Sequence, residues 1–318
     1  MKAPNYGVAT FDHLNAKGNP YHTLDKRVMV FADSLTSQPI NTQFRKVGSN
    51  TINYKPEDSI YISFFVQRQG IGDAPEIDDT LMLFFKDMNN QWHRQWAICG
   101  GFVGPFQEFF IPIAQYQFLI PNFQFRFVNF TKATGNLNHW HIDYIRIEKN
   151  RRFGEKTIQD VGIATVTDGL FKDYSNIPFS HYKSNIQDGR GKGPSMLVRN
   201  LNPNAVQTRF QLSISNKYKQ QIYYKPFVAS SRNLAGGRDT SESFESLAYD
   251  TLTTAEPRLD FVYSIDPQSN DGTPAAYNSL TNNNIIQTSH TIMPWYAYDD
   301  GSAEGGFGLD YAYLGKDR

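Results

Sequence analysis

The sequence has little of what several familiar classes of protein require. It contains one cysteine, Cys99, so no disulfide can form within the chain. Its 31 basic residues are balanced by 31 acidic ones, and this lack of a basic excess argues against a nucleic-acid partner. No run approaches the ~18 apolar residues that a transmembrane helix needs, so we expect no direct membrane span.

A further absence bears on the cell compartment. The opening stretch MKAPNYGVATFDHL has no apolar core of a signal peptide. The chain is therefore either cytosolic or a mature product whose export signal has been removed. Its 14% aromatic and only 19% charged residues favour the exported β-protein.

Cys99 follows Trp96, Ala97 and Ile98, which predicts a buried structural thiol.

Alternation with period two is the main structural signal, and it is clearest over residues 121–150. Phe123, Phe125 and Phe127 alternate with mainly polar residues, and a second apolar run over residues 140–145 follows the turn-forming segment TGNLNH. Side chains that alternate in this way predict strands with one buried face. We expect these two runs to form a hairpin at the centre of a β-sandwich.

The rest of the chain continues this pattern and predicts an all-β fold of tandem antiparallel β-sandwiches. Residues 1–150 contain about eight strand-like runs, including a hairpin of residues 80–85 and 91–99 around the turn residues of KDMNN. This favours a jelly-roll-like sandwich. Residues 151–293 contain about seven more runs, spaced as in an immunoglobulin-like or fibronectin-like sandwich. No amphipathic helix is long enough to cover a parallel sheet.

Several segments also carry a family resemblance. GVATFDHLNAKGNPY, FQFRFVNF, GNLNHWHIDYIRI and YDDGSAEGGFGL resemble the amino-terminal β-sandwich region, a MAM-like or jelly-roll module, of large uncharacterised Bacteroidota surface proteins. Those proteins are exported by the type IX secretion system. The resemblance implies a place at the cell surface, on the outer side of the outer membrane, and no assigned reaction. In those proteins a DDGSAE-like stretch opens a further sandwich, so we expect residues 294–318 to be a linker and the opening strand of another domain.

The resemblance also implies a structural calcium ion. HIDYIRI is similar to the closing strand of MAM-type and calcium-dependent carbohydrate-binding sandwiches, in which an aspartate at the position of Asp143 helps bind calcium. Asp12, in ATFDHL, is the expected partner. Calcium takes six to eight oxygen ligands, so backbone carbonyls would have to complete the site. The alternative is that Asp143 accepts a hydrogen bond from a loop backbone.

Two other groups of polar residues allow a site, although a structural role is favoured for both. Asp73, Glu76, Asp78 and Asp79 lie in one loop, where they could bind calcium, act as an acid and base pair in glycoside cleavage, or form a solvated turn. We favour the turn. His139 and His141 would share a strand face and could bind zinc, but no further ligand has a suitable spacing, which favours packing and hydrogen bonding.

Aromatic side chains are the remaining functional signal. Sugar-binding sandwiches stack sugar rings on tryptophan or tyrosine, and we predict Trp92, Tyr223 and Tyr224 as ligand-binding residues. Trp92 follows a turn and precedes polar residues, which favours exposure. Trp96 and Trp140 are also available for stacking, although core filling explains most of these aromatic side chains. No GxSxG elbow is present, and QDGRGKGP lacks the ending of a phosphate-binding loop.

The leading hypothesis is a non-enzymatic, exported surface protein whose sandwiches bind glycan or protein. The alternative is a structural or accessory subunit of an outer-membrane complex for secretion, gliding or nutrient uptake. A glycoside hydrolase is third. A groove with stacked aromatics would favour glycan binding, a broad apolar patch would favour docking, and two facing carboxylates in a cleft would favour hydrolysis.

Overall fold

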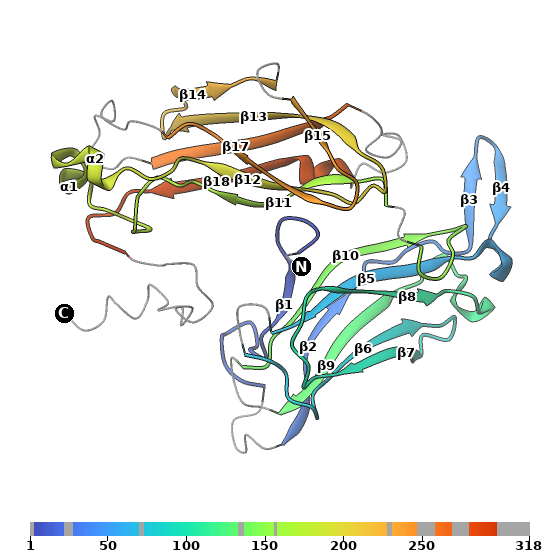
Figure 1. Ribbon diagram of the computed structural model, residues 1–318. Coiled ribbons are helices and arrows are strands. Elements are labelled where there is room, and N and C mark those ends of the chain that lie inside the picture. The colour runs from blue at the N-terminus through green and yellow to red at the C-terminus, as the bar shows by residue number, and fades with distance from the viewer. Residues whose placement is uncertain are drawn as a thin grey trace. The chain divides into compact units, whose positions relative to one another are not determined.

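The computed structural model describes residues 3–21, 28–69, 73–132, 137–155, 158–227, 231–246, 258–268 and 280–297. The chain divides into two compact units: the first consists mainly of Gly7–Glu155, and the second of the residues from Lys156 onward together with Pro4–Tyr6. Each unit is an antiparallel β-sandwich (Figure 1). The predicted all-β fold of tandem sandwiches is therefore confirmed. No helix in the described part of the chain is long and apolar enough to cross a membrane.

The first unit is a jelly roll of two four-stranded sheets. One sheet has the order β1 (Ala9–Phe11), β10 (Trp140–Glu148), β5 (Tyr61–Arg68), β8 (Gln107–Pro112), and the other β2 (Met29–Thr36), β9 (Phe125–Lys132), β6 (Thr80–Lys86), β7 (Trp92–Cys99). The hairpin of β3 (Phe44–Val47) and β4 (Asn50–Asn53) is inserted after β2, and short 3₁₀ turns cover Pro56–Asp58 and Tyr116–Phe118. Apart from the β6–β7 pair and this insertion, successive strands lie in opposite sheets, as in a jelly roll.

The expected hairpin over residues 121–150 is wrong in its pairing. β9 is hydrogen-bonded to β2 and β6, whereas β10 is hydrogen-bonded to β1 and β5 in the other sheet. Both strands are interior, so neither has a free edge for the other. The alternation itself is confirmed, because every second residue of β9 from Phe125 is buried. Alternation indicates which face is buried and carries no information about the partner strand.

The predicted β6–β7 hairpin is confirmed, together with its turn chemistry. Asp87 Oδ1 accepts hydrogen bonds from the backbone N–H groups of Asn89 and Gln91, each at 2.8 Å, and Asn90 has a φ of 62°. Asparagine tolerates this left-handed conformation better than most residues. The side chain of Asp87 thus closes the turn that brings the two strands together.

Aromatic rings fill the space between the two sheets of the first unit. Phe64 on β5 packs edge-on against Phe127 on β9 at 4.8 Å between ring centroids, and Trp140 is fully buried. Burying each such ring contributes roughly 1.5–3 kcal/mol. The prediction for Cys99 is wrong, since its thiol is exposed. It ends the edge strand β7, where the preceding Ile98 packs against the core and Cys99 faces the other way.

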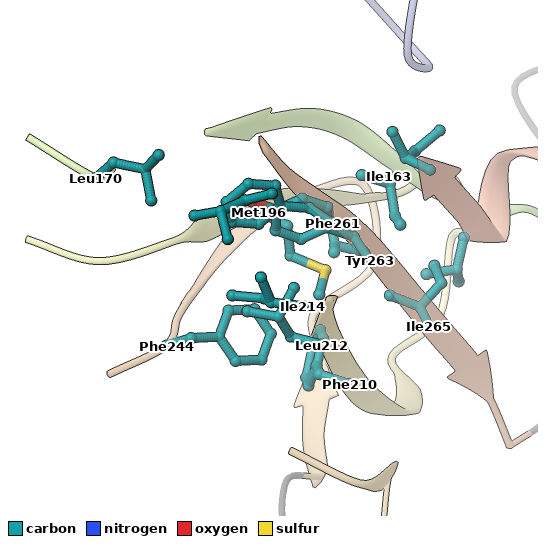
Figure 2. Close-up of a cluster of buried hydrophobic side chains, with 14 of the residues drawn as sticks. Ile163, Leu170, Met196, Phe210, Leu212, Ile214, Phe244, Phe261, Tyr263 and Ile265 are labelled. Carbon is teal, nitrogen blue, oxygen red and sulfur yellow. The ribbon is translucent and has the colours of Figure 1, made fainter. Parts of the chain in front are cut away.

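The second unit packs a three-stranded sheet against a larger one, as in fibronectin-like sandwiches. The first sheet is β11 (Val161–Thr167), β12 (Ser195–Asn200) and β16 (Asp239–Ser243); the second is β14 (Gln221–Lys225), β13 (Val206–Asn216), β17 (Arg258–Pro267) and β18 (Ile285–Thr291), with β15 (Ser231–Leu234) also on β13. A 3₁₀ turn covers Leu280–Asn284. Figure 2 shows the core between the sheets, to which Met196, Phe210 and Phe261 belong.

Two short helices interrupt the second sandwich between β11 and β12. α1 (Phe179–Ser184) and α2 (Ile186–Gly189) lie at one end of the sandwich (Figure 1). The residues after β18 are described as far as Ala297, and Ala297 forms an isolated bridge with Asn176 in the same insertion. The remainder of the expected linker, residues 298–318, lies outside the described residues.

Candidate ligand-binding pocket

The helical insertion of the second unit and Tyr296, after β18, line an open pocket of about 370 Å³. Such a volume lies within the usual range for small-molecule and saccharide sites. Its walls combine aromatic rings with charged and amide groups. They comprise Lys172, Asp173, Tyr174, Ile177, His181, Tyr182, Asn185, Asp188, Gly189 and Tyr296.

The pocket rests on two chain segments that pair closely. The N–H of Gly191 donates to the carbonyl of Leu170 at 2.9 Å, and the N–H of Lys172 donates to the carbonyl of Gly189 at 3.0 Å. A side chain on Gly191 would lie only 2.1 Å from the carbonyl oxygen of Gly169. The close approach therefore requires glycine, and it fixes the two ends of the insertion that carry the pocket.

One buried ring anchors α1 to the sandwich. Tyr182 is buried and packs edge-on against Phe171, with ring centroids 5.5 Å apart. α1 begins directly after Pro178, whose fixed φ suits the residue that precedes a helix. This packing holds the neighbouring His181 at the pocket wall, on the exposed side of the helix.

Two exposed tyrosines form the open wall of the pocket. Tyr174 and Tyr296 are 42% and 51% exposed, and their ring centroids lie 5.2 Å apart in a tilted arrangement. The hydroxyl of Tyr296 lies 3.1 Å from Nδ1 of His181. Exposed rings held by neighbours in this way offer a rigid apolar surface with polar edges, at little entropic cost on binding.

Exposed polar side chains surround these rings. Asp188 accepts a hydrogen bond from the amide of Asn185 at 2.5 Å, and its carboxylate retains further acceptor positions. Lys172 and Asp173 directly precede Tyr174 in the sequence, and both are exposed at the pocket. The pocket thus presents acceptors, donors and ring faces together, which is the combination that hydroxyl-rich ligands need.

The three aromatic residues predicted from sequence lie elsewhere. Trp92 is half-buried on β7, with the guanidinium of Arg126 over its ring at 4.2 Å and the ammonium of Lys86 at 6.0 Å. Tyr223 and Tyr224 lie on the edge strand β14. Tyr223 packs against the core, and this burial raises the pKa of its hydroxyl; Tyr224 is exposed. Ligand binding at these residues stays a prediction.

The structure does not bring Asp12 and Asp143 together. β1 pairs with β10 so that Phe11 lies opposite Trp140. Because the strands are antiparallel, Asp12 lies one position beyond this pair, toward the start of β10. Asp143 lies three positions from the pair, toward the end of β10. Four strand positions correspond to about 13 Å, too far for one calcium ion to contact both carboxylates.

Each of these two carboxylates has a local backbone partner instead. Asp143 Oδ1 accepts a hydrogen bond from the N–H of Tyr144 at 2.7 Å, and Asp12 Oδ1 accepts one from Leu14 at 3.0 Å. Among the residues that the structure describes, no group of three or more His, Cys, Asp or Glu side chains is arranged to hold a metal ion. Calcium at Asp143 or Asp12 stays a prediction, which a thermal melt with and without a chelator would test.

The acidic loop forms a structural turn, as favoured from the sequence, although it is less solvated than expected. Asp79 is buried, whereas Glu76 and Asp78 contact the ammonium of Lys132 at 2.5 Å and 3.4 Å. The backbone carbonyl of Asp73 accepts a hydrogen bond from the N–H of His139, directly before β10, at 2.9 Å. The loop is thereby attached to β9 through Lys132 and to the start of β10 through His139.

The two histidines also have structural contacts. Their ring centroids lie 6.1 Å apart on one face, as the period of two predicts. His141 Nδ1 lies 2.9 Å from the hydroxyl of Thr10, and its Nε2 lies 2.9 Å from the carbonyl of Gln69. Burial lowers the pKa of His141, and the charge of His139 acts in the same direction. Hydrogen bonding therefore accounts for His141 without a metal.

Sequence reasoning missed the pocket because its walls come from distant segments. The available signal was the aromatic richness of the non-strand stretches FKDYSNIPFSHY and PWYAY. Neither stretch alternates as a strand would. Only the fold places Tyr296 beside Tyr174.

Taken together, the fold and the pocket define an all-β protein of two tandem sandwiches with an aromatic-walled pocket in the second. Neither a protein-family model nor a curated protein matches the chain. Among solved structures, Bacteroides uniformis β-glucuronidase aligns over 93% of this chain and 32% of its own, with 8% identity and a TM-score of 0.31. A putative β-galactosidase from Bacteroides fragilis aligns over 81% of this chain and 35% of its own, with 12% identity and a TM-score of 0.27.

A family 2 β-galacturonidase from Eisenbergiella tayi aligns over 82% of this chain and 43% of its own, with 8% identity and a TM-score of 0.32. The chain spans about a third of the length of the first of these enzymes. TM-scores of this size are too low to support an argument about shared activity.

Proposed function

We propose that the protein is a non-enzymatic glycan-binding module of an exported cell-surface protein, and that the pocket of the second sandwich binds the sugar. The observation that carries this proposal is the wall of Tyr174 and Tyr296 beside exposed carboxylates. The apolar face of a sugar ring packs on an aromatic ring, while its hydroxyls donate hydrogen bonds to acceptors such as Asp188. The pocket combines both features.

The place at the cell surface rests on the resemblance of the sequence to exported Bacteroidota proteins. A second candidate is a docking subunit of an outer-membrane complex. Exposed apolar side chains in the first unit favour it: Ile77 and Phe102 are exposed in neighbouring loops, where a Cβ on Gly101 would lie 3.1 Å from Ile77. Such a surface suits a protein partner better than a sugar.

The glycan proposal is tested by screening an array of bacterial and host glycans and then measuring the affinity for the strongest ligand by calorimetry. Tyr296→Ala and Tyr174→Ala should each weaken binding by at least about tenfold, because each removes a stacking ring. Tyr218→Ala is the matched control, since Tyr218 is 64% exposed in the same unit but lies outside the pocket. Equal affinities for all three variants would contradict the proposal.

The same titration tests the surfaces predicted from sequence. Trp92→Ala and Tyr224→Ala remove side chains outside the pocket. If the pocket is the only site for the ligand, both variants bind like the wild type. Loss of affinity in either would place a sugar on that surface instead. Incubation of the bound oligosaccharide, followed by chromatography, distinguishes binding from hydrolysis, because a binding module leaves it intact.

A further inference from the structure

Asn176 fastens the chain segment that carries Tyr296 through its side chain and its backbone, beside one further hydrogen bond from the N–H of Ser175 to the carbonyl of Ala297 at 2.9 Å. We call residues 293–297, which follow β18, the strap. Asn176 Nδ2 donates hydrogen bonds to the carbonyls of Met293, at 3.1 Å, and of Trp295. Its Oδ1 accepts a hydrogen bond from the N–H of Met293 at 2.9 Å. The side chain therefore contacts the strap on both sides of Pro294.

The backbone of the same residue binds the other end of the strap. The N–H of Ala297 donates to the carbonyl of Asn176 at 3.0 Å, and the N–H of Asn176 donates back at 3.2 Å. Asn176 is only 3% exposed, so its amide makes these contacts out of water. Hydrogen bonds in such a place are costly to leave unmade.

These contacts determine where Tyr296 lies. Tyr296 is between the two attachment points, and its own polar contact is with His181 at the exposed pocket wall. Asn176 is two residues after Tyr174, so one residue fixes both halves of the tyrosine wall.

We propose that Asn176 is the positioning residue of the pocket: its amide holds the strap so that the ring of Tyr296 packs beside that of Tyr174 and the two rings form one surface for a sugar. This inference rests on the proposed glycan function for its binding consequence. The attachment of the strap itself does not depend on that function, so the two can be tested separately.

Asn176→Asp is the informative variant. It keeps the size of the side chain and the acceptor for the N–H of Met293, but it removes both donors and sets a carboxylate oxygen against two carbonyls. The backbone pairing with Ala297 remains. We expect glycan affinity to fall by about tenfold, the consequence of two lost hydrogen bonds.

The chain offers a matched control in Asn200. This buried asparagine has the same chemistry: Nδ2 donates to the carbonyls of Asn204, at 2.9 Å, and Leu234, at 3.0 Å, and Oδ1 accepts from the N–H of Asn202 at 2.9 Å. It ends β12 at the far end from the insertion, roughly 17 Å along the strand. Asn200→Asp should lower the melting temperature of the second unit to a similar extent without changing glycan affinity.

Limited proteolysis with chymotrypsin gives a readout that needs no ligand. Cleavage after Trp295 or Tyr296 requires the strap to leave the protein surface, so its rate rises when the attachment weakens. Asn176→Asp should be cut in the strap several-fold faster than the wild type, and Asn200→Asp at the wild-type rate. Identification of the fragments by mass spectrometry shows which bond is cut.

The outcomes separate the two proposals. Unchanged cleavage and unchanged affinity in Asn176→Asp, with a loss of affinity in Tyr296→Ala, would overturn the role of Asn176 and leave the glycan pocket standing. Faster cleavage in Asn176→Asp with no effect of Tyr296→Ala on any glycan would overturn the glycan function and keep the attachment. Equal effects of Asn176→Asp and Asn200→Asp on affinity would reduce Asn176 to a general stabilising residue, against the proposal.

Discussion

The carboxylate of Asp79 accepts a hydrogen bond from the hydroxyl of Thr131 at 2.7 Å, across 52 positions of sequence. It also accepts the backbone N–H groups of Lys132 at 3.2 Å and of Glu76 at 2.8 Å. The carboxylate is buried, so these three donors replace the water that an exposed aspartate would have. Asp79 thereby attaches the acidic loop to β9.

Replacing this carboxylate should destabilise the first unit. Asp79→Ala leaves one buried donor and two half-buried donors without their acceptor, which should lower the free energy of unfolding by about 3 kcal/mol. Asp78→Ala is the control: the exposed carboxylate of Asp78 lies 3.4 Å from the ammonium of Lys132, and its removal should cost less than about 0.5 kcal/mol. Urea unfolding of both variants measures the difference. Similar midpoints would mean that the loop contributes no stability.

His13 predicts a dependence of stability on pH. Burial lowers the pKa of its imidazole to about 4, and the charge of His139 acts in the same direction, while Asp12 opposes both. The unfolded chain binds a proton near pH 6.5, whereas the folded chain resists it until about pH 4. Stability should therefore fall as the pH decreases through this interval, by up to about 3 kcal/mol.

The matched variant is His13→Asn, because His13 has a φ of 65° and asparagine tolerates that conformation. Urea unfolding at pH 7 and pH 4.5 should show a smaller loss in the variant than in the wild type. The variant should still lose some stability as the pH decreases, because burial also lowers the pKa of His141. Burial raises the pKa of Asp33, so proton uptake by its folded carboxyl opposes the loss at the acid end. Equal slopes in the two proteins would exclude His13 as the main cause.

The local sequence pattern was sufficient to predict the strands of this protein, but it was insufficient to predict which strands pair. The phenylalanines at every second position correctly predicted one buried face of β9. They could not reveal that β10 belongs to the other sheet, because hydrogen-bond partners depend on which distant strands occupy each edge. The β6–β7 hairpin was predictable because its turn is local and Asp87 closes it with its own side chain.

The same limit applies to sites. Trp92 follows a turn, and from this we predicted an exposed ring. The guanidinium of Arg126 covers this ring, and Arg126 lies on β9, two strands away from β7 in the sheet order. The pocket, in turn, requires Tyr174 and Tyr296, which no local pattern connects. Long-range contacts thus decide which aromatic side chains are available to a ligand.

Glycine at position 191 should be essential for the pocket. A Cβ at this position would lie 2.1 Å from the carbonyl oxygen of Gly169 and 2.7 Å from that of Phe171. These atoms are backbone, so the clash can be relieved only by separating the two segments that carry the insertion. Gly191→Ala should break the hydrogen bond to Leu170 and displace the pocket residues on either side.

We expect Gly191→Ala to lower the free energy of unfolding of the second unit by about 3 kcal/mol, as overpacking against rigid backbone does. Gly237→Ala is the control: Gly237 has a φ of 64° and open space around it, so alanine there costs only about 1 kcal/mol of backbone strain. Calorimetric melts give the stabilities, and titration with the strongest glycan gives the affinities. Only the first variant should lose glycan binding, because only its strain lies under the pocket; equal loss in both would mean that binding depends on the stability of the unit as a whole.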